Sequence, residues 1–350
     1  GALALLIIDE EIGRADNAGG YKKGAWIPSG TRQVVAPLLL STDPMVPFFW
    51  ASPSIAETLF AGSGGDFRET KQKIDRDIKP QSMEFDGSKV SLHLDVERKP
   101  TVSANLLGIV EGSDPELSKE FVLLGAHLDH VGMNKDGYVF NGADDNGSGS
   151  VGILQVAKAL VLNPMKPKRS ILLAHWTGEE QGLLGSRCFV AYPPVPLADI
   201  VACINLDMIC RDTTLESIIE DARDLGVDRG ELSSYADEPA NLVAALTSSP
   251  SASMAETAVK LGAEHCGLIV VPLLSFPMLA NSDHFPFAQR NVPSVFFNTE
   301  GHRDLHQPSD TVEKINAEKM SRIVRLAYLL AFSIADAPEA PRWQKDPEKK

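Results

Sequence analysis

The chain has 350 residues, of which 43% are hydrophobic and 23% charged, and its formal net charge is −14 at pH 7. The acidic excess argues against nucleic acid as a partner, because binding it requires a basic face that displaces counterions. No stretch approaches the roughly 18 uninterrupted apolar residues that a membrane helix needs, so no membrane span is predicted.

The first part of the chain is predicted to be a small β-rich module, residues 1–85. Its candidate strands are residues 2–9, 33–40 and 46–50, and a short helix is expected at residues 54–61. Residues 86–336 are predicted to form the main domain. Residues 337–350 are rich in proline and charge, which is typical of a flexible tail.

The main domain alternates between strand-like and helix-like patterns. Hydrophobic residues alternate with polar ones over residues 90–96, as in a half-buried strand, and recur at helical spacing over residues 317–335. This alternation predicts an α/β fold with a mixed, mostly parallel central sheet and helices on both faces. The predicted strands are residues 90–96, 105–110, 121–126, 169–176, 200–207 and 292–298, and the predicted helices are residues 149–162, 183–192, 255–261 and 317–335.

Residues capable of binding metal follow the buried strands. Functional side chains in open α/β sheets gather just past the carboxyl ends of strands. Taken alone, most of these candidates resemble ordinary turn or surface residues, but together they favour a metal site. They are His127 and Asp129, Asp144 and Asp145 in a glycine-rich turn, Glu179 and Glu180, Asp207, and His302 and His306.

Asp207 is the most telling of these candidates. It closes the apolar run of residues 201–206, where an uncompensated carboxylate would be costly, and a cation would neutralise it. Imidazoles and carboxylates without a thiolate suit zinc, with cobalt or manganese as substitutes. The four cysteines form no Cys-x-x-Cys pair, so a cysteine zinc site is not expected. Five protein ligands exceed the usual three of one catalytic zinc, which predicts two cations sharing a carboxylate.

Six stretches carry a resemblance to a known family. They are GAHLDHVG at residues 125–132, GADDNGSG at 142–149, TGEEQGLLGS at 177–186, NLDM at 205–208, SDHFPF at 282–287 and DLHQPSDT at 304–311. In this order they resemble the co-catalytic zinc aminopeptidases, whose relatives include bacterial leucyl aminopeptidases and glutamate carboxypeptidase-like enzymes. The resemblance implies a zinc exopeptidase fold and a peptide substrate trimmed from its N-terminus.

The resemblance also assigns the metal ligands. It implies that His127 and Asp207 bind one zinc, that Glu180 and His306 bind the other, and that Asp145 bridges both. Asp144 is the rival for the bridging place and ranks second. Relatives often carry a cis peptide after the bridging aspartate, so the same bond is expected between Asp145 and Asn146.

Two further roles follow from the resemblance. Glu179 would be the general base that takes a proton from a metal-bridging water and passes it to the leaving amine. Asp129 would hold the ring of His127. One position departs from the family: Leu305 stands where many relatives carry a tyrosine that stabilises the oxyanion. Either the metal suffices there, or one of His302, Arg303 and His284 helps.

Other readings stay open at this point. A carboxypeptidase or dipeptidase would use the same ligands, and one of Arg211, Arg223 and Arg229 could bind a substrate carboxylate, although surface charge is the simpler reading of these arginines. A non-catalytic peptidase-fold scaffold or a single-zinc, glutaminyl cyclase-like transferase fits the full ligand set less well. Residues 1–85 resemble the back part of a protease-associated domain, and relatives with that module are mostly exported, which implies a secreted or periplasmic protein.

Overall fold

The computed structural model describes residues 5–8, 48–51, 53–85, 89–91, 101–224, 232, 234–274, 282–341 and 343. The chain divides into two compact units, one of residues 1–24 and 41–101 and the other of residues 25–40 and 102–350. None of the helices in the described part of the chain is long and apolar enough to cross a membrane.

In its described residues, the first unit has two strands and two helices. Strand β1 (Leu5–Ile8) pairs in parallel with β2 (Phe48–Ala51), and helix α1 (Pro53–Gly62) follows, so the predicted strands at 2–9 and 46–50 and the helix at 54–61 are confirmed. The strand predicted at residues 33–40 lies outside the described residues. Helix α2 (Phe67–Asp77) was not expected, because its sequence is strongly charged. The residue that could have indicated it is Asp66, whose side chain caps the helix by accepting the backbone amide of Glu69.

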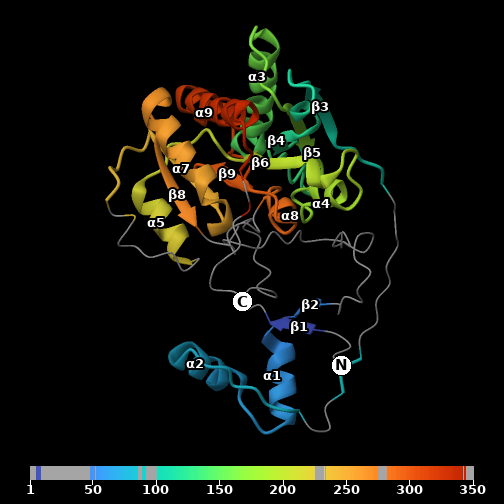
Figure 1. Ribbon diagram of the computed structural model, residues 1–350. Helices are drawn as coiled ribbons and strands as arrows, with labels where there is room; N and C mark the ends of the chain where they lie inside the picture. The colour runs from blue at the N-terminus through green and yellow to red at the C-terminus, as the bar shows by residue number, and fades with distance from the viewer. Residues whose placement is uncertain are drawn as a thin grey trace. The chain divides into compact units, whose positions relative to one another are not determined.

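Among its described residues, the second unit has a seven-stranded sheet of order β3-β5-β4-β6-β9-β7-β8 (Figure 1). The pairs β5–β4, β4–β6, β6–β9 and β7–β8 are parallel, and β3–β5 and β9–β7 are antiparallel. The expected mixed, mostly parallel sheet is therefore confirmed. The strands are β3 (Leu106–Val110), β4 (Phe121–His127), β5 (Ser170–Trp176), β6 (Ile200–Leu206), β7 (Leu242–Thr247), β8 (Ile269–Leu274) and β9 (Ser294–Asn298).

Helices cover both faces of this sheet (Figure 1). Alternate residues of one strand serve opposite faces: in β7, Val243 packs in the core with α3, α7 and α9, whereas Leu242 packs with α5. Helices α4 and α8 pack on the same face as α5 through Phe189 and Phe287. The helices are α3 (Gly149–Leu162), α4 (Leu184–Ala191), α5 (Leu215–Asp224), α7 (Ala252–Leu261), α8 (Phe285–Ala288) and α9 (Ala317–Asp336).

Most elements of the second unit agree with the sequence patterns. Helix α3 has the predicted bounds, and β4, β5, β6, β9 and α9 differ from their predictions by one or two residues at their ends. Strands β7 and β8 and helix α5 were not predicted, and most of the strand expected at residues 90–96 lies outside the described residues. Because β5, β4, β6 and β9 are parallel neighbours, their carboxyl ends share one edge of the sheet.

Candidate metal centre

The predicted metal ligands meet at the carboxyl edge of the sheet. His127 is the last residue of β4, Glu180 follows β5, Asp207 follows β6, and His306 lies in the loop after β9. Asp145 comes from the turn Ala143–Ser148 that leads into α3. Residues separated by up to 179 positions in the chain therefore converge because four parallel strands end together.

The five predicted ligands form a continuous line of contacts. The Nε2 atom of His127 lies 3.2 Å from Asp207 Oδ1 and 3.3 Å from Asp145 Oδ1. The Nε2 atom of His306 lies 3.0 Å from Asp145 Oδ2 and 3.0 Å from Glu180 Oε2. Asp145 thus faces a different imidazole with each carboxylate oxygen, which is the arrangement that a bridging ligand needs.

The turn around Asp145 is held from both sides. The peptide bond between Asp145 and Asn146 is cis, as expected. The Asn146 side chain donates to the carbonyl of Leu206 at 3.0 Å and accepts the amide of Gly149 at 2.9 Å. Burial raises the pKa of Asp145, but hydrogen bonds from His127 and His306 outweigh it and hold this pKa well below its ordinary value.

Asp144, the rival for the bridging place, is engaged elsewhere. Its Oδ1 accepts the backbone amide of Cys210 at 2.9 Å, and its Oδ2 lies 3.0 Å from His302 Nε2. The side chain is fully buried. Both oxygens of Asp144 are therefore bound to Cys210 and His302, whereas Asp145 faces the imidazoles of His127 and His306.

Asp207 is oriented by a short chain of polar side chains. Its Oδ2 accepts the hydroxyl of Ser282 at 2.7 Å, and Ser282 in turn accepts the amide group of Asn205 at 2.7 Å. This leaves Oδ1 for His127. Burial is the largest influence on Asp207 and raises its pKa, and a cation would remove that cost.

Asp129 contacts both His127 and the two glutamates, through different atoms. Its backbone carbonyl, at 3.0 Å, accepts from Nδ1 of His127, whereas its carboxylate is 3.9 Å from that nitrogen. A carbonyl can only accept, so Nδ1 donates to Asp129, and Nε2 is the ring nitrogen that faces the cluster. The Asp129 carboxylate accepts the backbone amides of Glu179 at 3.1 Å and Glu180 at 3.3 Å, which fixes the start of their loop.

Glu179 lies beside the His127 end of the cluster. Its carboxylate, His127 and Asp207 each place an atom within 4.8 Å of the others. Burial raises the pKa of Glu179 well above its ordinary value, and the neighbouring carboxylates of Asp207 and Asp283 add to the rise, while His127 opposes it. A raised pKa makes a carboxylate a stronger base, and carboxyl groups perturbed in this way are common at catalytic sites.

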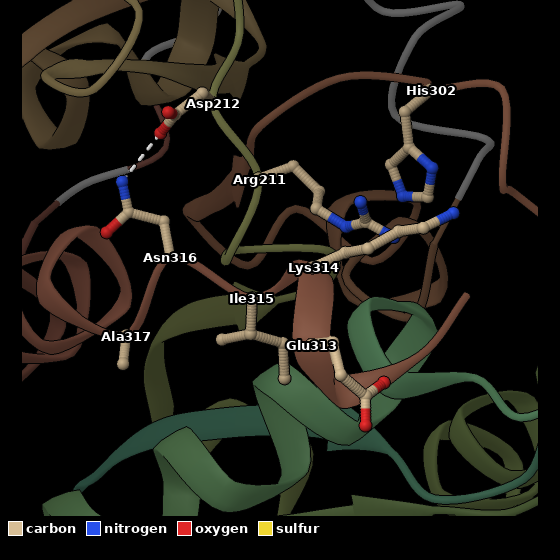
Figure 2. A pocket seen from close by; sticks show the side chains of 8 residues that line it. All are labelled: Arg211, Asp212, His302, Glu313, Lys314, Ile315, Asn316 and Ala317. Carbon is tan, nitrogen blue, oxygen red and sulfur yellow. Dashed lines mark hydrogen bonds between the residues drawn. The ribbon is translucent and has the colours of Figure 1, made fainter. Parts of the chain in front are cut away.

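Arg211 is neither a free surface charge nor an open substrate ligand. Its guanidinium lies 2.8 Å from Asp310 Oδ1 and 3.3 Å from Asp304 Oδ2, and the side chain is only 11% exposed. It borders a cavity of about 580 Å³ that is also lined by His302 and Lys314 (Figure 2). Both terminal nitrogens of its guanidinium are thus already paired with aspartates. The side chains of Arg223 and Arg229 lie outside the described residues.

The candidates for the role of the missing tyrosine differ in availability. His302 contacts Asp144 through Nε2 and accepts the Asp304 amide through Nδ1, so both of its ring nitrogens are occupied. His284 is fully buried, and its ring stacks on Phe296 with centroids 4.8 Å apart. Of the three candidates, Arg303 alone is exposed.

Sequence reasoning gave no role to three residues that contact the cluster. His130 lies 2.9 Å from Glu180, Ser282 orients Asp207, and Asp310 accepts the backbone amides of the bridging turn. All three stand inside the stretches that carry the family resemblance. For His130, the signal was a second histidine three residues after His127, at the same strand end.

The donor set fits zinc. Two imidazoles and three carboxylates converge without a thiolate, which suits zinc, cobalt or manganese. A second group of atoms within 4.8 Å of one another is formed by His130, Asp145 and Glu180. Carboxylates this close together repel one another when ionised, and divalent cations would offset this repulsion.

Comparison with known proteins places the chain among peptidases. The sequence profile of peptidase family M28 matches residues 105–331. A probable leucine aminopeptidase of Arthroderma benhamiae is 30% identical over 234 residues, which cover 63% of this chain and 56% of the relative. A probable glutamate carboxypeptidase of the same fungus is 34% identical over 126 residues, which cover 35% of this chain and 16% of the relative.

A solved structure shares the fold. LapA of Legionella pneumophila superposes with a TM-score of 0.50 at 20% identity, covering 67% of this chain and 57% of LapA. The chain thus spans little more than half the length of the leucine aminopeptidase and of LapA.

Proposed function

The chain belongs to peptidase family M28, and we propose that it is a zinc-dependent exopeptidase that removes residues from the N-termini of peptides. The leucine aminopeptidase among its relatives supports this specificity. The presence of every expected ligand, together with Glu179, supports a catalytic role over that of an inactive scaffold.

The proposal includes two cations. His127 and Asp207 would hold one, Glu180 and His306 the other, and Asp145 would serve both. One observation carries this assignment: Asp145 directs Oδ1 to His127 at 3.3 Å and Oδ2 to His306 at 3.0 Å. A single-zinc transferase would need neither the second imidazole nor a shared carboxylate. When bound, the cations would polarise the scissile carbonyl and lower the pKa of water.

Glu179 is the general base in this proposal. Its raised pKa suits a group that takes a proton from the attacking water and returns it to the leaving amine. The Asp129 carboxylate would keep the loop of Glu179 and Glu180 at a fixed distance from β4 by accepting their amides. Adjacent glutamates can then divide the work, one as ligand and the other as base.

A carboxypeptidase is the second candidate, supported by the relative described as a probable glutamate carboxypeptidase. Recognition of a substrate C-terminus usually requires an available cation, commonly an arginine. Arg211 is near the cluster but is already paired with Asp304 and Asp310. This pairing favours the aminopeptidase.

The test is digestion of a peptide mixture by zinc-loaded protein, followed by mass spectrometry. Half of the peptides carry free N-termini and half acetylated N-termini. Ladders that shorten only from free N-termini would support the aminopeptidase and name its preferred residue. Shortening from the C-terminus in both halves would establish the carboxypeptidase. Wild-type protein that cleaves no more peptide than the Glu179→Gln variant would contradict an exopeptidase.

Two coarser features complete the proposal. We assign catalysis to residues 86–336, which include the family match at 105–331, with residues 1–85 as a partial protease-associated module and residues 337–350 as a tail. The protein would be secreted or periplasmic, in line with that module. Fractionation of the source cells, with detection of the protein outside the cytoplasm, tests this location.

A further inference from the structure

His130 makes a contact that the proposed ligand set does not use. Its Nδ1 lies 2.9 Å from Glu180 Oε1, while His306 Nε2 lies 3.0 Å from Glu180 Oε2. The two oxygens of one carboxylate thus face two different imidazoles. We propose that His130 is a positioning residue: it donates its Nδ1 hydrogen to Glu180 Oε1 and leaves Oε2 as the single oxygen that binds the cation. This inference rests on the proposed metal-binding function of Glu180.

The contacts of His130 favour a donor over a further metal ligand. Its Nδ1 is at hydrogen-bonding distance from Glu180 but 3.6 Å from Asp145 Oδ2. The other ring nitrogen, Nε2, is buried without a hydrogen-bond partner among the described residues. A metal-bound imidazole nearly always donates its second N–H to an acceptor. A neutral ring with its proton on Nδ1 leaves only a lone pair at Nε2, and a buried unpaired acceptor is tolerated better than a buried unpaired N–H.

The His130 ring is held in place by its neighbours. Gly142 has φ of +62°, and a Cβ at this position would lie 2.7 Å from His130 Cγ and 2.5 Å from the Asp145 carbonyl oxygen. The missing side chain at Gly142 is therefore what lets the ring pack against the bridging turn. The rings of His130 and His306 also meet edge to face, with centroids 5.6 Å apart.

This arrangement has a consequence for the metal centre. With Oε1 engaged, Glu180 is restricted to one-oxygen binding, and its Oε2 stays directed at His306. Hydrogen bonds to ligating carboxylates orient them, and their loss typically weakens metal affinity about 10–100-fold. The effect should concern the cation held by Glu180 and His306 more than the cation held by His127 and Asp207.

The experiment titrates the metal-free 350-residue chain with Co²⁺ in competition with a chelator, and follows the visible absorption of the bound ion. Four variants are compared with the wild type: His130→Ala, His130→Asn, His306→Ala and His265→Ala. The amide nitrogen of asparagine occupies nearly the place of histidine Nδ1 and can donate to Glu180, but an asparagine is a poor replacement for a metal-binding imidazole. His265 is the control: it is a histidine with no role in the proposed cluster, and its side chain is 55% exposed.

We expect His130→Ala to weaken one of two binding steps about 10–100-fold, with the other step unchanged. His130→Asn should recover most of the affinity, and both variants should keep the absorption bands of the wild type. Loss in His130→Asn equal to that in His130→Ala, or bands altered as in His306→Ala, would overturn the positioning role. Wild-type affinity in His130→Ala would likewise overturn the positioning role. A wild-type protein that binds no cation would contradict the proposed metal-dependent function itself.

Discussion

Asp310 holds Asp145 by its backbone: Oδ2 of Asp310 accepts the amide of Asp145 at 3.1 Å, from a position 165 residues further along the chain. The same oxygen accepts the amide of Asp144 at 2.9 Å, and Oδ1 pairs with Arg211 at 2.8 Å. The bridging turn is thus tied to the loop that also carries His306. Arg211 compensates the charge of a carboxylate that is fully buried.

Replacing Asp310 should therefore disturb both stability and metal binding. Asp310→Asn removes the charge that pairs with Arg211 and places an amide against backbone N–H donors. Breaking one side of a buried ion pair costs about 3–5 kcal/mol, and we expect a loss of this order in the free energy of unfolding, measured with urea. Asp304→Asn is the control, because Arg211 then keeps its contact with Asp310; its loss should be clearly smaller. Equal losses would contradict the role given to Asp310.

Glu179→Gln should separate binding from turnover. The amide keeps the size of the side chain but cannot accept the proton, so kcat should fall about 10²–10⁴-fold while KM changes little. Elemental analysis should find the same cation content as in the wild type. Glu264→Gln, at a side chain that is 51% exposed, should retain full activity. Substantial turnover by Glu179→Gln would place the base elsewhere.

Binding of the cations should release protons. Burial lowers the pKa of both His127 and His306, but the carboxylates of Asp207 and Asp145 raise that of His127 well above its ordinary value, and Asp145 and Glu180 raise that of His306 to about 10. In the metal-free protein both rings are therefore protonated near neutral pH, and a cation must displace those protons. Zinc affinity should then rise as pH increases toward about 10 and fall as pH decreases.

Calorimetry in buffers with different ionisation enthalpies measures this release directly. The apparent binding enthalpy should change with the buffer in proportion to the protons released, and the change should be smaller in His306→Ala. An enthalpy that does not depend on the buffer would show that the imidazoles are neutral before zinc binds.

Removal of the metal should abolish activity and lower stability together. A chelator would leave the cluster of Asp145, Glu180 and Asp207 without its cations, and zinc added back should restore both properties. Zinc at 100 times its dissociation constant should raise the free energy of unfolding by about 2.7 kcal/mol for each site. Thermal melts with and without zinc, alongside a peptide assay, provide the measurement. Activity that persists after complete removal of metal would contradict the proposed chemistry.

Local patterns in the sequence determined much of this protein. Three features could be predicted: the bounds of α3, the positions of the strands that end at the cluster, and the identity of the candidate ligands. Each of them depends on the residue types within a short stretch of the chain. The cis bond after Asp145 was expected from the family resemblance alone. Strands β7 and β8 were not predicted: each is a short, continuously apolar run, and such runs do not distinguish a buried strand from a buried helix.

The tertiary structure decided how the candidate residues share their work. That the Asp129 carbonyl contacts His127 while its carboxylate holds the Glu179 loop depends on β4 and β5 lying side by side in one register. That Arg211 is paired with two aspartates about 100 residues away, and that His130 contacts Glu180, depends on the order of the parallel strands. Contacts between side chains far apart in the chain depend on the order of the strands and the path of the loops. The preference for zinc, in contrast, follows from the types of the donor residues alone.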